Sequence, residues 1–216
     1  MRPRNISTGI TYLSTHWHYE PYYLSDEEIH RDFTLFNRMG IDYITLVLIW
    51  KYVEPTPGNY LEDAYDDIER VCEIAKEHGL EVIIDFHTMM HENSFTMPTW
   101  LSPRKFEQVF KDNSAHQAWL NYLEHSVSKL KDVENIHSWH MMNEPARSLY
   151  PITDNWACDV TVEEFIELWQ EMRTVFKSIS DKPVSIRFAA KSFDNHFNRD
   201  PRICLLYTSP SPRDRS

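Results

Sequence analysis

The feature that most constrains the fold of this chain is a regular alternation of short apolar runs with longer segments of helical periodicity. The short runs are rich in β-branched and aromatic residues, as expected for strands that are buried on both faces. Alternating strands and helices predict parallel strands joined by right-handed crossovers, and therefore an α/β fold. The expected strands are 10–13, 43–50, 81–87, 136–142 and 183–188.

Local signals mark where the helices begin and end. Ser25 followed by Glu28 predicts a capping box at the start of the first helix, and Gly40 is expected to end it. Gly79 ends the second helix in the same way. Two further helices are expected at 115–131 and 162–180, each with apolar residues in register on one side. The inward face of the first helix is predicted to be Ile29, Phe33, Phe36 and Met39.

Two α/β architectures are compatible with this pattern, the open doubly wound sheet and the closed eight-stranded barrel. An open sheet usually carries a glycine-rich ligand loop, but the sequence has only 4 glycines and no GxGxxG or GxxxxGK string. Polar and aromatic residues instead follow the carboxyl ends of successive strands, where a barrel keeps its site. We therefore expect the N-terminal part, about five βα units, of a (β/α)8 TIM barrel.

Composition narrows the classes of partner. The chain has 22 Lys and Arg against 33 Asp and Glu, a formal net charge of -11 without a basic cluster, which argues against nucleic acid. No apolar run is long enough to span a membrane, and residues 1–5 precede no apolar signal region. Three scattered cysteines indicate neither a disulfide framework nor a zinc site, so a reducing, cytoplasmic location is the default expectation.

Three segments resemble the clan A glycoside hydrolases, which include family 5 cellulases and mannanases and family 42 β-galactosidases. These segments are 50–60 after the second strand, 84–87 at the end of the third and 139–145 at the end of the fourth. The resemblance implies a retaining hydrolase without a cofactor, acting on a β-linked glycoside or polysaccharide. Glu144 of Asn-Glu-Pro would be the general acid/base, and Asn143 would bind the sugar 2-hydroxyl.

That resemblance also implies a second carboxylate, the nucleophile, at the end of strand seven, which the sequence does not contain. Five strands in about 200 residues extrapolate to roughly 320 residues for eight strands. The 216-residue chain itself is therefore expected to be inactive. Family 5 enzymes usually carry an Arg in the second strand, but Thr45, Leu46 and Val47 occupy that stretch, so the resemblance is to the clan rather than to one family.

Other residues near the strand ends are candidates for binding the sugar, each with a structural alternative. His87 resembles the strand-three histidine of several family 5 enzymes, but it could equally be a structural histidine. Trp17 and Trp50 could stack on a pyranose or pack in the core. His16 and His18 could contact the sugar or be structural.

The pair His16 and His18 also has the ligand spacing of metal-dependent amidohydrolase barrels. That class needs a histidine on strand five, and 184–189 offers none, so we expect no metal. A third possibility is a carbohydrate-binding barrel that has kept the cleft but lost the nucleophile.

The C-terminal segment has a different origin in our interpretation. Residues 204–214 resemble the translation of a transposase end adapter that is used in sequencing libraries. We therefore expect a partial catalytic domain at 1–203 and a non-native tail at 204–216. On this interpretation residue 203 is where a sequencing read stopped, and the chain could be an inactive truncated product.

Overall fold

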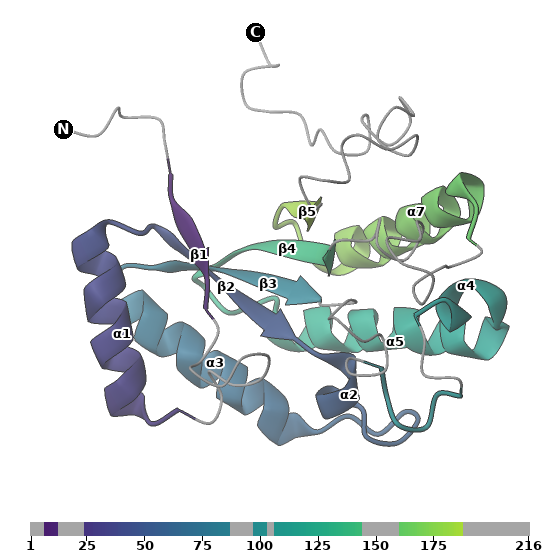
Figure 1. Cartoon of the computed structure of the whole chain (residues 1–216), viewed down its shortest axis with the longest axis horizontal. Helices are drawn as coiled ribbons and strands as arrows, with labels where there is room; N and C mark the ends of the chain where they lie inside the picture. The colour runs from purple at the N-terminus through teal and green to yellow at the C-terminus, as the bar shows by residue number, and fades with distance from the viewer. Residues whose placement is uncertain (1–6, 13–23, 87–96, 103–105, 144–159, 188–216) are drawn as a thin grey trace, which may run out of the picture.

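The computed structural model describes residues 7–12, 24–86, 97–102, 106–143 and 160–187. The expected α/β fold is confirmed, with five strands and the helices between them in alternation (Figure 1). The tail at 204–216 lies outside the described residues. In chain order the elements are β1(Gly9–Thr11), α1(Asp26–Met39), β2(Tyr43–Leu48), α2(Trp50–Val53), α3(Glu62–Glu77), β3(Glu81–Phe86), α4(Gln108–Lys111), α5(Asn113–Leu130), β4(Ile136–Asn143), α7(Val162–Ile179) and β5(Val184–Arg187).

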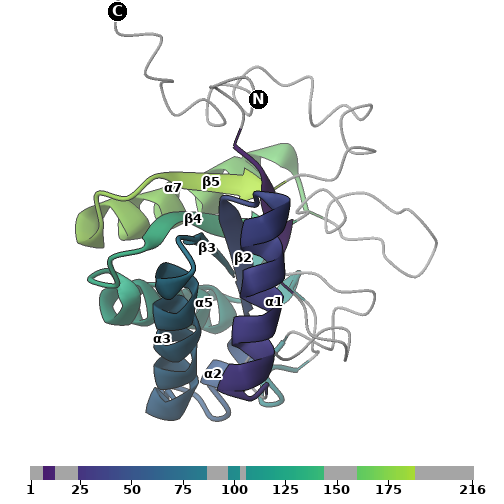
Figure 2. The ribbon, with the colours of Figure 1, turned by 90° about the vertical axis from the view of Figure 1, so that its left-hand side faces the viewer.

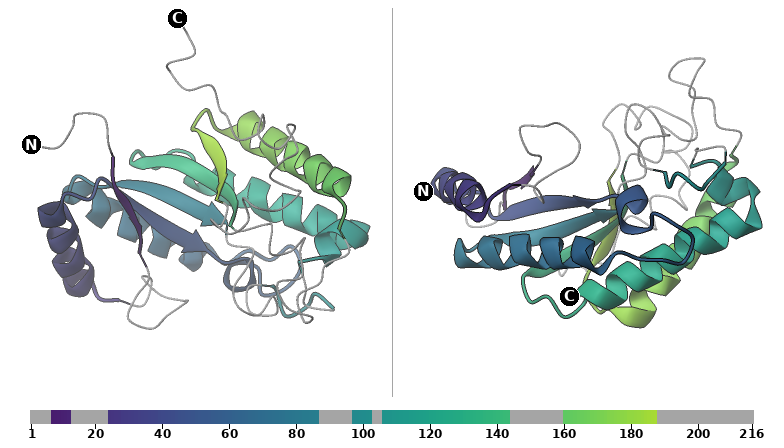
Figure 3. Two further views of the ribbon diagram at one scale, coloured as in Figure 1. Left: turned by 45° about the horizontal axis from the view of Figure 1, so that its top comes forward. Right: turned by 90° about the horizontal axis from the view of Figure 1, so that it is seen from below.

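The strands form one parallel sheet in the order β1-β2-β3-β4-β5, which is also their order along the chain. A doubly wound sheet reverses its strand order at a switch point, and this sheet has none. Helices α1 and α3 lie side by side (Figure 2), and α3 and α5 run along one side of the sheet (Figure 3). The sheet is therefore the N-terminal part of a (β/α) barrel rather than an open doubly wound sheet.

Side chains on the two faces of this sheet differ in character. On the helix-facing side, Ile44, Leu46 and Leu48 of β2 belong to the main core, together with Ile84 and Phe86 of β3. These positions alternate with residues that face the barrel interior, because successive side chains of a strand point to opposite faces. The helix-facing core therefore fixes which residues are directed inward.

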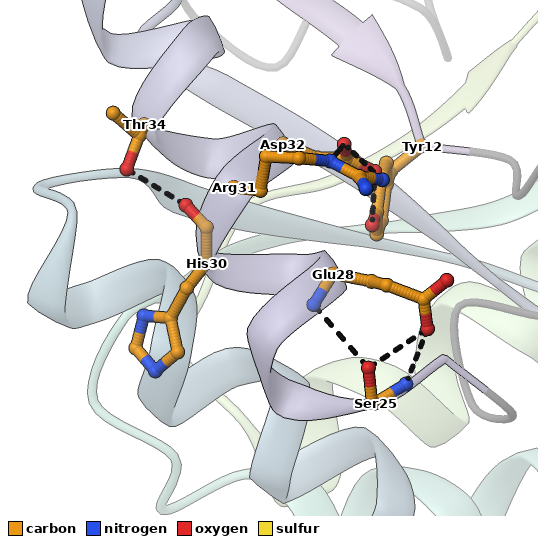
Figure 4. A network of polar contacts seen from close by, with 7 residues as sticks. All are labelled: Tyr12, Ser25, Glu28, His30, Arg31, Asp32 and Thr34. Atoms are coloured by element: carbon orange, nitrogen blue, oxygen red, sulfur yellow. Dashed lines mark hydrogen bonds and ion pairs between the residues drawn. The ribbon is translucent and has the colours of Figure 1, made fainter.

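Helix α1 begins as its sequence predicts. The Ser25 hydroxyl accepts from the backbone N–H of Glu28, and the Glu28 carboxylate accepts from the Ser25 backbone N–H at 3.0 Å, which completes the capping box (Figure 4). The Tyr12 hydroxyl, just after β1, donates to Asp32 Oδ2 at 3.1 Å. Gly40 ends the helix with φ 70, a left-handed conformation that favours glycine.

The structure corrects part of the predicted inward face of α1. Ile29 and Phe33 are buried, and Phe36 packs against the core, but Met39 is 59% exposed. Three-residue steps drift around a helix, because each residue turns by about 100°. Met39 therefore lies about 120° away from Phe33 around the axis and misses the core.

Two boundaries differ from the sequence prediction after β2 and in the long segment before α5. The strand ends at Leu48, and Trp50 begins the short helix α2 instead of ending the strand. Helix α4 lies within the stretch 88–113, which was expected to be irregular. Trp119 and Trp169 are 0% and 1% exposed, so their predicted packing role is confirmed.

Candidate active site

The segment that follows β2 is built around one buried carboxylate. Glu54 is 1% exposed, and its Oε2 accepts from Trp50 Nε1 at 2.5 Å. Its Oε1 accepts from the backbone N–H of Gly58 at 2.6 Å, and its backbone oxygen accepts from Trp100 Nε1 at 3.0 Å. Gly58 has φ 73, which lets the chain turn back toward the carboxylate. Glu54 thus joins α2, the turn and the segment at Trp100.

Burial raises the pKa of Glu54 above its usual value, and the hydrogen bonds from Gly58 and Trp50 act in the opposite direction. Both carboxylate oxygens are engaged by donors of the same segment. This arrangement suits an anchor of the loop at the carboxyl end of β2, where a barrel binds its ligands. It gives Glu54 a structural role rather than a role in proton transfer to a ligand.

Trp50 lies inside an aromatic cluster. Its ring stacks on Tyr122 with centroids 5.7 Å apart, and it meets Trp119 and Trp100 edge to face at 5.2 and 5.6 Å. The side chain is 0% exposed. A stacking platform needs an open ring face. In this structure Trp50 therefore has the packing role that the sequence left as the alternative.

Two rows of side chains cross the interior face of the sheet, as the strand register shows. Neighbours in register on parallel strands point to the same face. The lower row is Thr11, Thr45, Ile83 and Ser138, and the upper row is Val47, Asp85, His140 and Ser185. The upper row is nearer to the carboxyl ends of the strands, and it contains two ionisable groups.

Asn143 ends β4 directly above the upper row. It is 7% exposed and is in register with Arg187 of β5. His140 is in register with Ser185 and Asn143 with Arg187, and both of these β5 residues face the interior. His140 and Asn143 are three residues apart, and they can share this face because the register shifts between them. Asn143 is thus held at the carboxyl end of a buried strand, and Glu144 follows it in the chain.

The remaining predicted site residues lie outside the described residues. These residues are His16, Trp17, His18, His87 and Glu144. Of the predicted set, the structure therefore places only Asn143 and Trp50. Within the described part of the chain, no group of three His, Cys, Asp or Glu side chains could hold a metal ion. No described helix is long and apolar enough to cross a membrane.

Comparison with known proteins identifies the family. The sequence profile of the cellulase family, glycosyl hydrolase family 5, matches residues 3–181. The chain belongs to glycosyl hydrolase family 5. The match holds although Thr45, Leu46 and Val47 carry no Arg, so that departure does not remove the chain from family 5.

Among curated proteins, the chain is similar to cellodextrinase A of Ruminococcus flavefaciens. The two are 27% identical over 139 residues, which are 63% of this chain and 34% of the relative. The chain thus spans about a third of the length of this curated relative.

Solved structures support the barrel fold. A family 5 (GH5_18) protein of Bifidobacterium longum in complex with Manβ1-4GlcNAc matches with a TM-score of 0.69 at 18% identity, over 84% of this chain and 43% of its own. The exo-β-1,4-mannosidase of Opitutaceae bacterium strain TAV5 matches with a TM-score of 0.71 at 18% identity, over 85% and 32%. Endo-glycoceramidase II of Rhodococcus sp. matches with a TM-score of 0.60 at 14% identity, over 76% and 44%.

Three polar residues of the site region were not singled out from the sequence. The sequence analysis assigned Glu54 to a loop. Its spacing of four residues from Trp50 could have indicated a contact between the two side chains across a helical turn. Asp85 and His140 are ionisable residues within the buried strands β3 and β4. A polar residue at every second position of a buried strand is the signal that could have indicated a barrel interior.

Proposed function

We propose that this chain carries the acid/base half of a retaining glycosidase that acts on a β-linked glycoside or polysaccharide. The observation that carries the proposal is the position of Asn143, buried at the carboxyl end of β4 in a family 5 chain and directly followed by Glu144. In this proposal Glu144 protonates the glycosidic oxygen, and Asn143 hydrogen-bonds the sugar 2-hydroxyl. His87, Trp17, His16 and His18 are proposed sugar contacts.

The chemistry requires a second carboxylate. A retaining glycosidase places its nucleophile about 5 to 5.5 Å from the acid/base, which then serves in both steps of double displacement. We propose that this nucleophile belongs to the seventh strand of the complete barrel. The five strands described here would then supply proton transfer and sugar binding, and the chain alone would not complete the reaction.

The names of the relatives guide the choice of substrates. One relative is called a cellodextrinase, one is called an exo-β-1,4-mannosidase, and one was solved with Manβ1-4GlcNAc. β-1,4-Linked glucosides and mannosides are therefore the first substrates to assay. The proposal covers the β-linked class and leaves the choice of sugar to this assay.

The experiment compares Glu144→Gln with wild type in a complete barrel that contains this chain. With a poor leaving group, removal of the acid should lower kcat/KM by about 10² to 10⁴. With an activated aryl glycoside, whose leaving group needs no protonation, the first step should be spared. Glu167→Gln, an exposed position of α7, is the matched control and should keep full activity.

Two outcomes would contradict the proposal. An equal loss on both substrates would count against an acid role for Glu144. A wild-type barrel that binds β-linked sugars without hydrolysing them would favour the non-catalytic carbohydrate-binding alternative.

A further inference from the structure

A ring contact joins the loop that follows β2 to helix α5. The imidazole of His125 in α5 stacks on Tyr60 with centroids 4.1 Å apart and an interplanar angle of 14°. Tyr60 lies at the end of the loop that Glu54 anchors, and the backbone N–H of Leu61 donates to the backbone oxygen of Val53 at 2.8 Å, which closes this loop. Helices α3 and α5 run along the same side of the sheet (Figure 3), so the stack ties the loop before α3 to α5.

The surroundings of this imidazole favour its uncharged form. The Nε2 atom of His125 is buried and has no hydrogen-bond partner among the residues that the structure describes. A neutral histidine can leave one ring nitrogen without a proton, whereas a charged histidine carries a donor on both nitrogens. A buried donor without an acceptor is unfavourable. Protonation of His125 in its present position would therefore cost free energy.

Two charged side chains of the described residues act on this ring. Glu62 of α3 places its Oε1 3.8 Å from Nε2 of His125, which is beyond hydrogen-bond reach. The other oxygen of Glu62 pairs with Lys129 of α5, so this carboxylate already has a cation. Tyr60 and Tyr65 flank the ring, and burial raises the pKa of Tyr60 to about 12 and the pKa of Tyr65 further still, so both hydroxyls stay uncharged.

These effects give the proton affinity of His125 a direction. Burial lowers the pKa of His125 below its usual value, Glu62 opposes this effect, and Lys129 reinforces it. The folded state therefore binds this proton more weakly than the unfolded state. The stability that depends on an uncharged His125 is present above the unfolded pKa of about 6.5, and it is lost as the pH falls from there through the folded pKa.

We propose that His125 is an acid-sensitive contact that holds the loop after β2 against α5. The uncharged ring lies flat on Tyr60 and keeps the loop in place. Protonation puts a donor at the buried Nε2 atom, so the ring moves toward water or toward Glu62, and either movement disrupts the stack. Acid therefore loosens the loop at the carboxyl end of β2.

The test is amide hydrogen exchange at about pH 7.5 and about pH 5.5, on either side of the usual histidine pKa, in wild type and in His125→Phe. The Phe ring can still stack on Tyr60, but it cannot be protonated. After correction for the intrinsic exchange rate, protection of the Leu61 amide should be lower at the acid pH in wild type and unchanged in His125→Phe. His137→Phe replaces a histidine of β4 that lies against Tyr43, and this control should keep the wild-type response.

Four results would overturn the proposal. The first is unchanged protection of Leu61 in wild type, which would mean that a charged ring stays stacked on Tyr60 as a cation over an aromatic face. The second is an equal loss of protection in His125→Phe. The third is an equal loss at Ile29 of α1, because that would report unfolding of the whole chain. If His125→Phe fails to fold, the ring signals of wild-type His125 are followed by NMR, and a titration midpoint above about 6.5 is the fourth.

Discussion

Replacing Glu54 with Gln should measurably destabilise the fold, because the carboxylate accepts two buried hydrogen bonds on separate oxygens. The donors are Trp50 Nε1 at 2.5 Å and the backbone N–H of Gly58 at 2.6 Å. A Gln side chain offers one accepting oxygen and turns its NH2 group toward the other donor. The donor that faces the NH2 group is then buried without an acceptor, which costs about 1–3 kcal/mol, or roughly 2–10 °C in Tm.

The assay is urea denaturation monitored by circular dichroism at 222 nm. This signal does not depend on tryptophan fluorescence, which the Trp50→Phe variant would change. A double-mutant cycle with Trp50→Phe removes the indole donor and should give a coupling of about 1–3 kcal/mol between positions 50 and 54. The matched control is Glu134→Gln, which removes an exposed carboxylate that pairs with Lys76. Solvent screens such an exposed pair, so the control should unfold much like wild type.

The difference in stability between wild type and Glu54→Gln should change with pH in one direction. Burial raises the pKa of Glu54 above its usual value, so the folded state holds that proton more tightly than the unfolded state. The resulting stability is fully present below the unfolded pKa, about 4.3, and is lost as the pH rises through the folded pKa. The cost of Glu54→Gln should therefore grow as the pH is lowered through this window. A cost below about 0.5 kcal/mol, or no coupling to Trp50, would refute the anchor role of the carboxylate.

Four further predictions concern the turn at Gly58 and three positions outside this anchor. Gly58→Ala should cost about 1 kcal/mol in urea denaturation, because φ is 73 and no atom lies within 4 Å of a new Cβ, so backbone strain alone acts. Thr161→Ala should cost about 1 kcal/mol by removing the capping box of α7. The Thr161 N–H and Lys111 lower the pKa of Glu164, so stability that depends on this carboxylate is lost as the pH falls through its folded pKa, and Glu164→Gln should flatten the acid limb of the stability curve. Burial raises the pKa of the Cys72 thiol to about 12, so peptide-resolved alkylation at pH 8 should label Cys72 only upon unfolding, and rapid labelling of the native protein would contradict its burial.

The fold could be predicted from the sequence wherever local chemistry and hydrophobic periodicity agree. Ser25 and Glu28 gave the start of α1, and Gly40 and Gly79 gave helix ends, because each of these signals acts within a few residues. The prediction that Met39 faces the core was wrong, because residues spaced in steps of three drift around the helix axis. The burial of Trp50 could not be predicted, because it depends on Tyr122 of α5, which is far away in the sequence. The burial of Glu54 could not be predicted either, because it depends on contacts with Trp50 and Trp100.

The hydrophobic residues of β3 indicate which of its side chains face the barrel interior. Ile84 and Phe86 pack against the helix side, where Phe86 meets Tyr122 and Phe176. A slip of one residue would turn Asp85 toward that apolar core and expose the two hydrophobic residues to the barrel interior, so the register has strong support. The direction of Asp85 therefore follows from the hydrophobic residues on either side of it. Its register partner, His140, follows from the alignment of β4 with β3, which the β3 sequence does not contain. The hydrophobic alternation of β3 thus indicates that Asp85 points into the barrel, and the structure supplies its neighbour on β4.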